Sequence, residues 1–350
     1  MNSPLLSICC LGYNHAHFLK ENLASIAKID YPNIEVIAID DGSSDNSSEL
    51  LHELSKTTPF PLTVIAQENT GNIGKNFNRA LAKASGDLVT FIALDDVFNP
   101  KVVLSEIHQM IQSENLAFIA STDAYPINDD GFLINTSIHL PLKNKTDVSI
   151  QDLLNIEYSH FGGFYIQGSI FRANLVHEIG GFDEDMTGDD IVLRTKLFKY
   201  LLNHKGWSFK LIQEPSVFYR LHDNNVHKNT VRQIKIVTEY LNKYWPDSAS
   251  PPILLNWVES VIKDKPLNES IPIFSMNRRA GLLSKEPRII SAIEKKVLKD
   301  NNKFRKIKKF FYKKEKISES IRKITLLNHF SFQYDNKKSN SATKHYSEYF

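Results

Sequence analysis

Three pairs of adjacent aspartates are the residues of this sequence whose type and spacing best suit chemistry. They are Asp40-Asp41, Asp95-Asp96 and Asp189-Asp190. A carboxylate can bind a divalent cation, accept hydrogen bonds from a ligand or remove a proton, and it can also simply cap a helix. The sequence around each pair decides which of these uses it favours.

The first pair opens the run DDGSSD at residues 40–45, directly after an apolar stretch that ends at Ile39. Carboxylates at the end of a strand, followed by Gly42 and serines, can accept hydrogen bonds from a base or a ribose. The same run also suits a plain strand-to-helix turn with Asp45 or Ser47 as the N-cap. Both interpretations stay open at this point.

The second pair follows the apolar stretch Leu88–Ala93. Adjacent ionised carboxylates repel each other and are costly to desolvate, and a divalent cation offsets both costs. Mg²⁺ or Mn²⁺ takes carboxylate oxygens and commonly shares its shell with substrate phosphates. The alternative is a solvated loop in which an aspartate caps the helix that begins near Pro100.

The third pair lies at the expected start of a helix, in GFDEDMTGDDIVLRTKL. Acidic residues in a first turn stabilise the helix dipole, which is their ordinary role. The chemical alternative is a general base that deprotonates an acceptor hydroxyl.

The elements that must position these pairs alternate between strand and helix. Buried strands are predicted at Leu5–Leu11, Ile34–Ile39, Leu62–Ala66, Leu88–Ala93 and Ala117–Ser121. Helical spacing between them predicts helices at Phe18–Ala27, Ser47–Ser55, Ile73–Ala84 and Pro100–Gln112. This alternation predicts an α/β fold with a doubly wound, mostly parallel sheet flanked by helices, whose ligands sit at the carboxyl ends of the strands.

Later segments divide the chain further. A short strand is expected at Ile166–Phe171, and helices at Ala173–Ile179 and from about Asp189 to Leu202. We predict a catalytic domain over residues 1–230, with a ligand-binding half at 1–98 and a catalytic half at 99–230. A helical, basic C-terminal extension over 231–335 and a disordered tail over 336–350 complete the prediction.

Composition and charge exclude several classes of protein. The chain is 42% hydrophobic with a net charge of +2, and residues 303–323 alone carry +8. A globally basic nucleic-acid binder is therefore not indicated. Cys9 and Cys10 are neighbours on a strand and cannot form an unstrained disulfide, and no apolar run is long enough to span a membrane. We expect a cytoplasmic protein without a signal peptide.

The basic segment 303–323 has apolar residues such as Phe304, Ile307 and Phe311 near helical spacing, continued by Ile321 and Ile324. A basic amphipathic helix can bind an anionic membrane surface, which would place the protein at the inner face of the cytoplasmic membrane. It can equally be a surface helix that packs on the rest of the chain.

Five segments together resemble glycosyltransferase family 2, whose members are inverting enzymes with a GT-A fold. They are LLSICCLGYNHAHFLKENLASI, IEVIAIDDGSSDNS, NTGNIGKNFNRALAKASGDLVTFIALDDVFNPKVV, IGGFDEDMTGDDIVLRTKL and YRLHDNNVH. The resemblance covers about residues 4–230, and the segments occur in the family's order. It implies a bacterial polysaccharide-type enzyme, for example in capsule or O-antigen synthesis, that moves a sugar from a nucleotide-sugar donor, by default a UDP-sugar.

The resemblance also implies roles for individual residues. Those implied to contact the nucleotide-sugar are Tyr13, Asn14, Asp40, Asp41, Asp45, Lys75, Asn78 and Asp95. Asp96 would bind Mn²⁺ or Mg²⁺ at the donor diphosphate, and His222 would complete the metal site unless it is an ordinary loop histidine. Asp190 would be the general base that activates a hydroxyl of a growing or lipid-linked glycan.

The chain departs from the family pattern at several positions. Ala93-Leu94 precede Asp95-Asp96 where a third acidic residue is common, and Lys196 replaces the usual helix arginine. A catalytically inactive nucleotide-binding module is therefore one alternative. A sugar nucleotidyltransferase is another, although Gly12-Tyr13-Asn14-His15 lacks the glycine-rich basic loop of that class, and no GxGxxG supports a dehydrogenase.

Overall fold

The computed structural model describes residues 3–134, 141–142, 145, 147–221, 229–311, 321–326 and 330–335, with backbone only from residue 301 onward. The chain divides into two compact units, Met1–Asn225 and Val226–Phe350. Each unit is described by itself. The division falls a few residues before the boundary predicted at residue 230.

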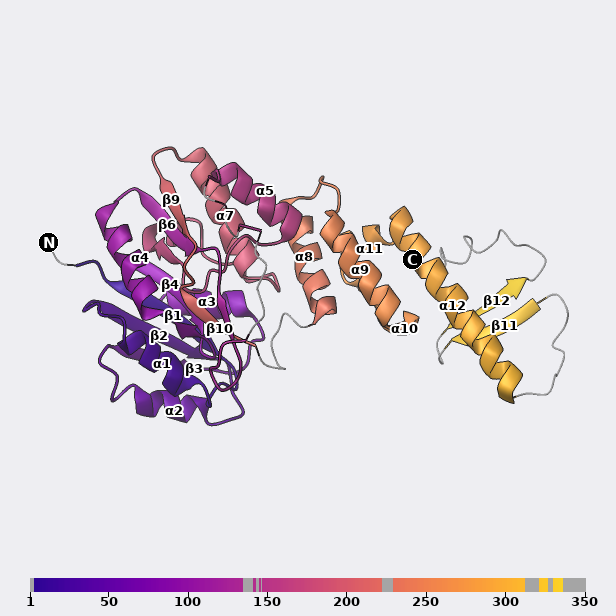
Figure 1. The fold of residues 1–350 in the computed structure, drawn as a ribbon, viewed down its shortest axis with the longest axis horizontal. Coiled ribbons are helices and arrows are strands. Elements are labelled where there is room, and N and C mark those ends of the chain that lie inside the picture. The colour runs from indigo at the N-terminus through magenta and orange to yellow at the C-terminus, as the bar shows by residue number, and fades with distance from the viewer. Residues whose placement is uncertain are drawn as a thin grey trace. The chain divides into compact units, whose positions relative to one another are not determined.

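The first unit is built on a seven-stranded sheet in the order β3-β2-β1-β4-β8-β6-β9 (Figure 1). Its strands are β1 (Leu6–Gly12), β2 (Ile34–Asp40), β3 (Leu62–Ala66), β4 (Leu88–Ala93), β6 (Leu116–Ser121), β8 (Ile170–Arg172) and β9 (Ser208–Ile212). Strands β3, β2, β1 and β4 are parallel, β8 is antiparallel to both neighbours, and β9 is parallel to β6. The predicted α/β class with a mostly parallel sheet is confirmed.

Helices cover both faces of this sheet. They are α1 (Leu19–Ala27), α2 (Ser47–Leu54), α3 (Ile73–Leu81), α4 (Pro100–Gln112), α5 (Ile150–His160), α6 (Ala173–Glu178) and α7 (Asp190–Asn203). Residues of α1, α2 and α4 share one hydrophobic core with Cys10 of β1. On the other face, Phe77 of α3 packs against Phe91. Because strand side chains alternate, Cys9 and Cys10 are buried on opposite faces as free thiols.

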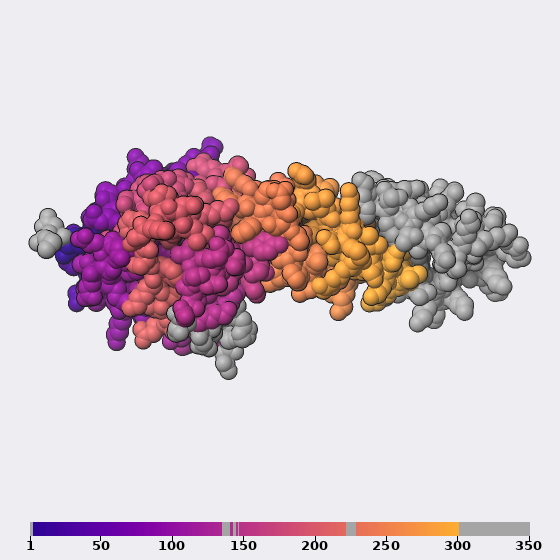
Figure 2. Space-filling model, turned by 90° about the horizontal axis from the view of Figure 1, so that it is seen from above, coloured from indigo at the N-terminus to yellow at the C-terminus, as the bar shows by residue number. Residues whose placement is uncertain are grey.

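A second sheet is formed by three short strands that follow strands β4, β6 and β9 of the main sheet. It has the order β5-β10-β7, with β5 (Val97–Phe98), β10 (Val217–Arg220) and β7 (Tyr125–Ile127). Strand β5 directly follows Asp95-Asp96, so this sheet brings residues near 220 to the second acidic pair. Figure 2 shows that residues of about 200–220, in salmon, also lie beside much earlier segments, in purple and magenta, at the surface.

Helix α5 and strand β9 were not predicted. Helix α5 begins at a capping box, in which the Ser149 hydroxyl accepts from the Asp152 amide and the Asp152 carboxylate accepts from the Ser149 amide. That signal is present in the sequence, but it follows a stretch in which the periodic pattern is weak. The element proves important because it carries Glu157 toward Asp190.

The second unit is mainly helical. It contains α8 (Thr230–Tyr244), α9 (Pro252–Asp264), α10 (Leu267–Ser270), the 3-10 helix η2 (Ile271–Ser275), α11 (Arg278–Leu283) and α12 (Pro287–Phe311). Apolar residues at helical spacing, such as Ile234 and Leu241 of α8, are fully buried. Among the described residues, no helix is both long enough and apolar enough to cross a bilayer.

The prediction of one basic helix through Phe304–Leu327 is wrong at its C-terminal end. Helix α12 ends at Phe311, and Ile321–Leu326 forms strand β11, antiparallel to β12 (Phe330–Asp335). β-branched residues favour a strand in β11, and β12 alternates Phe330, Phe332 and Tyr334 with polar residues. The tail 336–350 and all side chains of the basic segment 303–323 lie outside what is described.

Candidate functional site

The carboxyl ends of three parallel strands bring two of the acidic pairs together. Gly12 at the end of β1 pairs with Asp40 at the end of β2, and Leu11 pairs with Ala93 at the end of β4. Asp40-Asp41 and Asp95-Asp96 therefore leave the sheet at the same edge. This is the edge at which α/β sheets bind their ligands.

The turn after β2 is organised around Asp40, which is 2% exposed. Its carboxylate accepts from the Ser43 hydroxyl and, at 3.3 Å, from the Ser43 amide. Gly42 has a φ of +72°, and a Cβ there would lie 2.4 Å from the Asn69 amide nitrogen. The turn needs glycine for its backbone conformation and for this close approach.

The turn after β1 is joined to the turn after β2. Asn14 has a φ of +57°, its amide donates to Ser43 Oγ at 2.8 Å, and its side-chain oxygen accepts from the Ser44 amide at 2.7 Å. The Asp45 carboxylate accepts from the Ala16 amide at 3.1 Å and from the Ser47 amide. Tyr13, 48% exposed, lies beside these joined turns.

Asp41 holds the loop 67–71 against the same edge. Its carboxylate accepts from the Gln67 side chain at 2.8 Å, and from the amides of Thr70 and Gly71 at 2.9 and 3.2 Å. Burial raises the pKa of Asp41, but the hydrogen bonds from Thr70 and Gln67 outweigh it and hold the pKa below its ordinary value. Asp41 is thus an ionised anchor for this loop.

Helix α3 follows that loop and is fastened to the segment that leads to the third acidic pair. Its N-cap Asn72 accepts from the Lys75 amide at 2.8 Å and donates to the Glu184 carbonyl at 2.7 Å. Asn78 donates to the Phe182 carbonyl and accepts from the Phe182 amide, both at 2.9 Å. The side chain of Asn78 is therefore engaged in joining two parts of the protein.

Both carboxylates of the second pair are buried. Asp95 is 7% exposed and Asp96 is 1% exposed. Asp96 Oδ1 accepts from the Arg220 amide at 2.7 Å, and the Asp96 carbonyl accepts from the Asn22 side chain at 2.8 Å. Burial, together with the charge of Asp95, raises the pKa of Asp96 well above its ordinary value. A nearby cation would relieve that cost.

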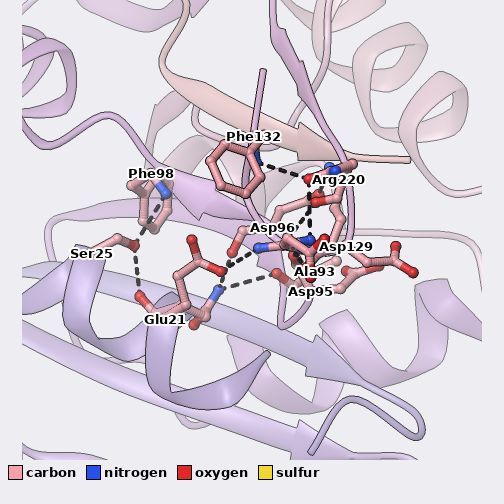
Figure 3. A network of polar contacts seen from close by, with 12 residues as sticks. Glu21, Ser25, Ala93, Asp95, Asp96, Phe98, Asp129, Phe132 and Arg220 are labelled. Carbon is pink, nitrogen blue, oxygen red and sulfur yellow. Dashed lines mark hydrogen bonds and ion pairs between the residues drawn. The ribbon is translucent and has the colours of Figure 1, made fainter. Parts of the chain in front are cut away.

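Arg220 is fully buried at the end of β10 and joins the pair to its surroundings (Figure 3). Its Nε donates to the Asp95 carbonyl at 2.7 Å, and its Nη1 donates to the carbonyls of Asn128 and Asp129, both at 2.7 Å. Its Nη2 contacts Glu21 Oε2 at 2.5 Å. The arginine fixes the backbone around Asp95 while its own amide binds Asp96.

Two histidines need separate mention. His15, which is not among the residues that the resemblance implies for the site, has its Nε2 3.7 Å from Asp95 Oδ2, so it lies at the second acidic pair. His222, the predicted metal ligand, lies outside the described residues.

The third pair stands at the start of α7. Asp189 is the N-cap residue, but its side chain makes no capping hydrogen bond, and Asp190 begins the helix. Burial, and then the charge of Asp190, raises the pKa of Asp189 to about 8. The Asp190 side chain is 31% exposed, and its Oδ2 lies 3.3 Å from Arg194 Nη1. Lys196 instead contacts Asp183 at 3.1 Å.

Two stacked tyrosines connect the second and third pairs. The rings of Tyr165 and Tyr219 are 5.4 Å apart with an interplanar angle of 18°. Burial raises the pKa of each phenol, and the charges of both Asp96 and Asp190 raise it further. Tyr219 precedes Arg220, whose amide binds Asp96. Tyr165 follows Phe164, whose carbonyl accepts from the same Arg194 nitrogen that contacts Asp190. The stack therefore joins the surroundings of the two acidic pairs.

The residues present fit a divalent cation bound with a phosphate ligand. Asp95 and Asp96 supply oxygen donors in a buried setting that disfavours two uncompensated charges. The described residues contain no cluster of three or more His, Cys, Asp or Glu that could hold a metal. Mg²⁺ and Mn²⁺ at phosphate sites commonly use only one or two carboxylates and take the remaining ligands from substrate and water.

Comparison with known proteins gives the class. Residues 7–175 match the family model described as glycosyl transferase family 2. The first unit is thus a family 2 glycosyltransferase domain, and the predicted family is confirmed. One curated relative is the GalNAc(5)-diNAcBac-PP-undecaprenol beta-1,3-glucosyltransferase of Campylobacter jejuni, 26% identical over 196 residues, which are 56% of this chain and 60% of that one. The chain spans less than two thirds of that relative and of three further curated relatives.

Two solved structures share the fold. S. aureus TarS 1-349 in complex with UDP-GlcNAc has a TM-score of 0.53 and 19% identity, over 84% of this chain and 80% of that one. The mannosyltransferase PcManGT from Pyrobaculum calidifontis, in complex with GDP-Man and Mn²⁺, has a TM-score of 0.50 and 16% identity, over 85% and 88%. At these identities the likeness establishes the GT-A fold alone.

Several residues at the site were missed from the sequence. They are His15, Glu157, Tyr165, Arg194, Tyr219 and Arg220. Arg220 ends an apolar strand with a charge, and Arg194 lies four residues after Asp190, so both carried a weak signal. The sequence offers no signal for Glu157, because it meets Arg194 only through the packing of α5 on α7.

Proposed function

We propose that this protein is an inverting glycosyltransferase that moves a sugar from a nucleotide-sugar donor, by default a UDP-sugar, to a glycan hydroxyl. The observation that carries the proposal is the stacking of Tyr165 on Tyr219, which joins the segment beside Asp96 to the segment beside Asp190. It supports a single site in which one carboxylate suits a metal–diphosphate and the other suits a base.

Each carboxylate has a defined part in the proposed reaction. Asp95 and Asp96 would hold Mn²⁺ or Mg²⁺, and the bound ion would neutralise the negative charge on the departing diphosphate. Asp190 takes the proton of the acceptor hydroxyl as its oxygen bonds to the anomeric carbon. The bond between that carbon and the diphosphate oxygen breaks in the same step, and its electron pair leaves with the nucleotide.

The donor side of the proposal rests on the joined turns. Asp40, Asp41, Asp45, Asn14 and Tyr13 gather at the strand edge, and Lys75 with Asn78 follows on α3. The structures with UDP-GlcNAc and with GDP-Man and Mn²⁺ support a nucleotide-sugar and a divalent cation in this fold. The acceptor of the C. jejuni relative supports a lipid-linked glycan, and peripheral membrane association stays a prediction.

Calorimetric titration with UDP tests the donor site first. We expect binding in the presence of Mn²⁺, loss of binding in EDTA, and loss again in the Asp96→Ala variant. Transfer from UDP-glucose, UDP-galactose, UDP-GlcNAc and UDP-GalNAc is then measured as UDP release, with and without undecaprenyl diphosphate-linked sugars. Failure of UDP, dTDP and GDP to bind with metal present would overturn the assignment, and binding without any transfer would favour an inactive module.

A further inference from the structure

A buried arginine stands directly behind the proposed base. Arg194 is 3% exposed on α7, four residues after Asp190, and therefore on the same face of the helix. Its Nη1 lies 3.3 Å from Asp190 Oδ2 and donates to the Phe164 carbonyl at 2.8 Å. One guanidinium nitrogen thus links Asp190 to the backbone of the segment before β8.

The other nitrogens of this guanidinium are held by a second helix. Arg194 Nε and Nη2 donate to the two carboxylate oxygens of Glu157 on α5, at 2.8 and 3.2 Å. Glu157 is 1% exposed. Gly162 has a φ of +152°, and a Cβ at this position would lie 3.0 Å from Arg194 Nη2. The two-pronged contact and the close backbone fix the plane of the guanidinium.

The charged and titratable groups around Asp190 come from four segments. They are Asp189 and Arg194 on its own helix, Glu157 on α5, Tyr165 in the segment before β8, and Tyr219 on β10. Arg194 is the one cation in this set. Its carboxylate neighbours raise its pKa above the ordinary value although burial lowers it, so it stays charged.

We propose that Arg194, held in place by Glu157, is a positioning residue that orients the Asp190 carboxylate toward the acceptor hydroxyl. This inference rests on the proposed function, in which Asp190 is the base. A base acts only when its oxygen points at the proton it removes, and small misplacements are costly in rate. The Asp190 side chain is partly exposed, whereas Arg194 is buried and contacts one of the two carboxylate oxygens of Asp190.

A purely structural role of the Arg194–Glu157 ion pair can be separated by experiment from a role in positioning Asp190. Replacing a buried ion pair by apolar residues of similar volume is often neutral or even stabilising, whereas removing one partner is strongly destabilising. A paired replacement should therefore keep the protein folded while it removes the restraint on Asp190, together with the hydrogen bond to the Phe164 carbonyl. The variant that does this is Arg194→Met combined with Glu157→Met.

The test compares binding with turnover. For the paired variant we expect a cooperative thermal unfolding transition, wild-type UDP affinity with Mn²⁺, an unchanged donor KM, and a kcat for UDP release lower by about 10- to 100-fold. Arg194→Lys keeps the charge but loses the planar fork. The kcat of Arg194→Lys should fall while its KM stays unchanged. This variant provides the test if the paired variant does not fold. Wild-type kcat in either folded variant would overturn the proposal.

Two controls complete the experiment. Arg288 makes a matching two-pronged contact with Glu259 in the second unit, at 2.6 and 2.7 Å, and its paired replacement by methionines should leave kcat unchanged. Asp190→Asn separates the two hypotheses. If that variant is fully active, the base assignment in the proposed function fails. If it is inactive while the paired variant has wild-type kcat, only the positioning role fails.

Discussion

The two ends of the candidate site hold their carboxylates by different physical means. At the donor end, Asp41 and Asp45 are held by backbone amides and neutral side chains of neighbouring turns. At the acceptor end, Asp190 is held by a buried guanidinium that is itself paired with Glu157. The donor end is built from turns that follow successive strands, whereas the acceptor end depends on how two helices pack.

This difference has consequences for tolerance to change. Most of the groups that hold Asp41 and Asp45 are backbone amides, which only a substitution to proline removes, so these turns keep those hydrogen bonds when side chains change. The acceptor end depends on single side chains, and each can be lost. We therefore expect the acceptor end to govern rate, while the donor end governs affinity and local stability.

The largest expected effect comes from Asp190→Asn. Loss of the base should lower kcat by about 10²- to 10⁴-fold, while UDP affinity is retained because the donor turns are untouched. UDP release and calorimetry measure the two quantities. Asp183→Asn, which disturbs the contact with Lys196 on the same segment, is the control and should stay close to wild type. Equal losses of rate and affinity in Asp190→Asn would contradict the comparison.

Arg220→Met should be the most damaging change near the donor end. It leaves the carbonyls of Asp95, Asn128 and Asp129 without their donor, so we expect a loss of about 3–5 kcal/mol in the free energy of unfolding and weaker UDP binding with Mn²⁺. Arg172→Met removes an arginine that donates to three carbonyls around the end of α4. It should destabilise the fold without weakening UDP binding, as urea denaturation and calorimetry would show.

The two ends should also respond to pH in opposite directions. The pKa of Asp189 is raised to about 8 in the folded state, so the unfolded chain ionises first and stability falls as pH rises from about 4 toward 8. Asp189→Asn should remove this decline and stabilise the protein at pH 8, with little effect at pH 4. Thermal denaturation of wild type and Asp189→Asn between pH 4 and 8 measures this difference. If the stability of both proteins depends on pH in the same way, the prediction is wrong.

The smallest expected effect on stability comes from Asp41, and its dependence on pH is opposite to that of Asp189. Its folded pKa lies below the ordinary value, so its contribution is present above about pH 4 and is lost as pH falls through the folded pKa. Asp41→Asn should cost about 1 kcal/mol at pH 7 and flatten the acid side of the stability profile. Unfolding melts between pH 3 and 7 provide the measurement. A variant more acid-sensitive than wild type would show that another group dominates.

Much of the fold could be predicted because its signals are local. The strands Leu62–Ala66 and Leu88–Ala93 and the helix Pro100–Gln112 have the predicted bounds. Apolar runs between helical patterns specify βαβ units, and the carboxyl ends of those strands place two acidic pairs on one edge. The error at β11 arose because a few apolar residues can satisfy a helical spacing and a strand equally well.

The sequence by itself therefore determined the parallel strands β1 to β4, the family and the acidic pairs, since each depends on residues close together in the chain. Only the tertiary structure decided which groups restrain those acids. Asp96 meets the Arg220 amide across 124 positions, and Arg194 meets Glu157 across 37. Such contacts leave no periodic or local trace, because they arise when separate elements pack and buried charges must find partners.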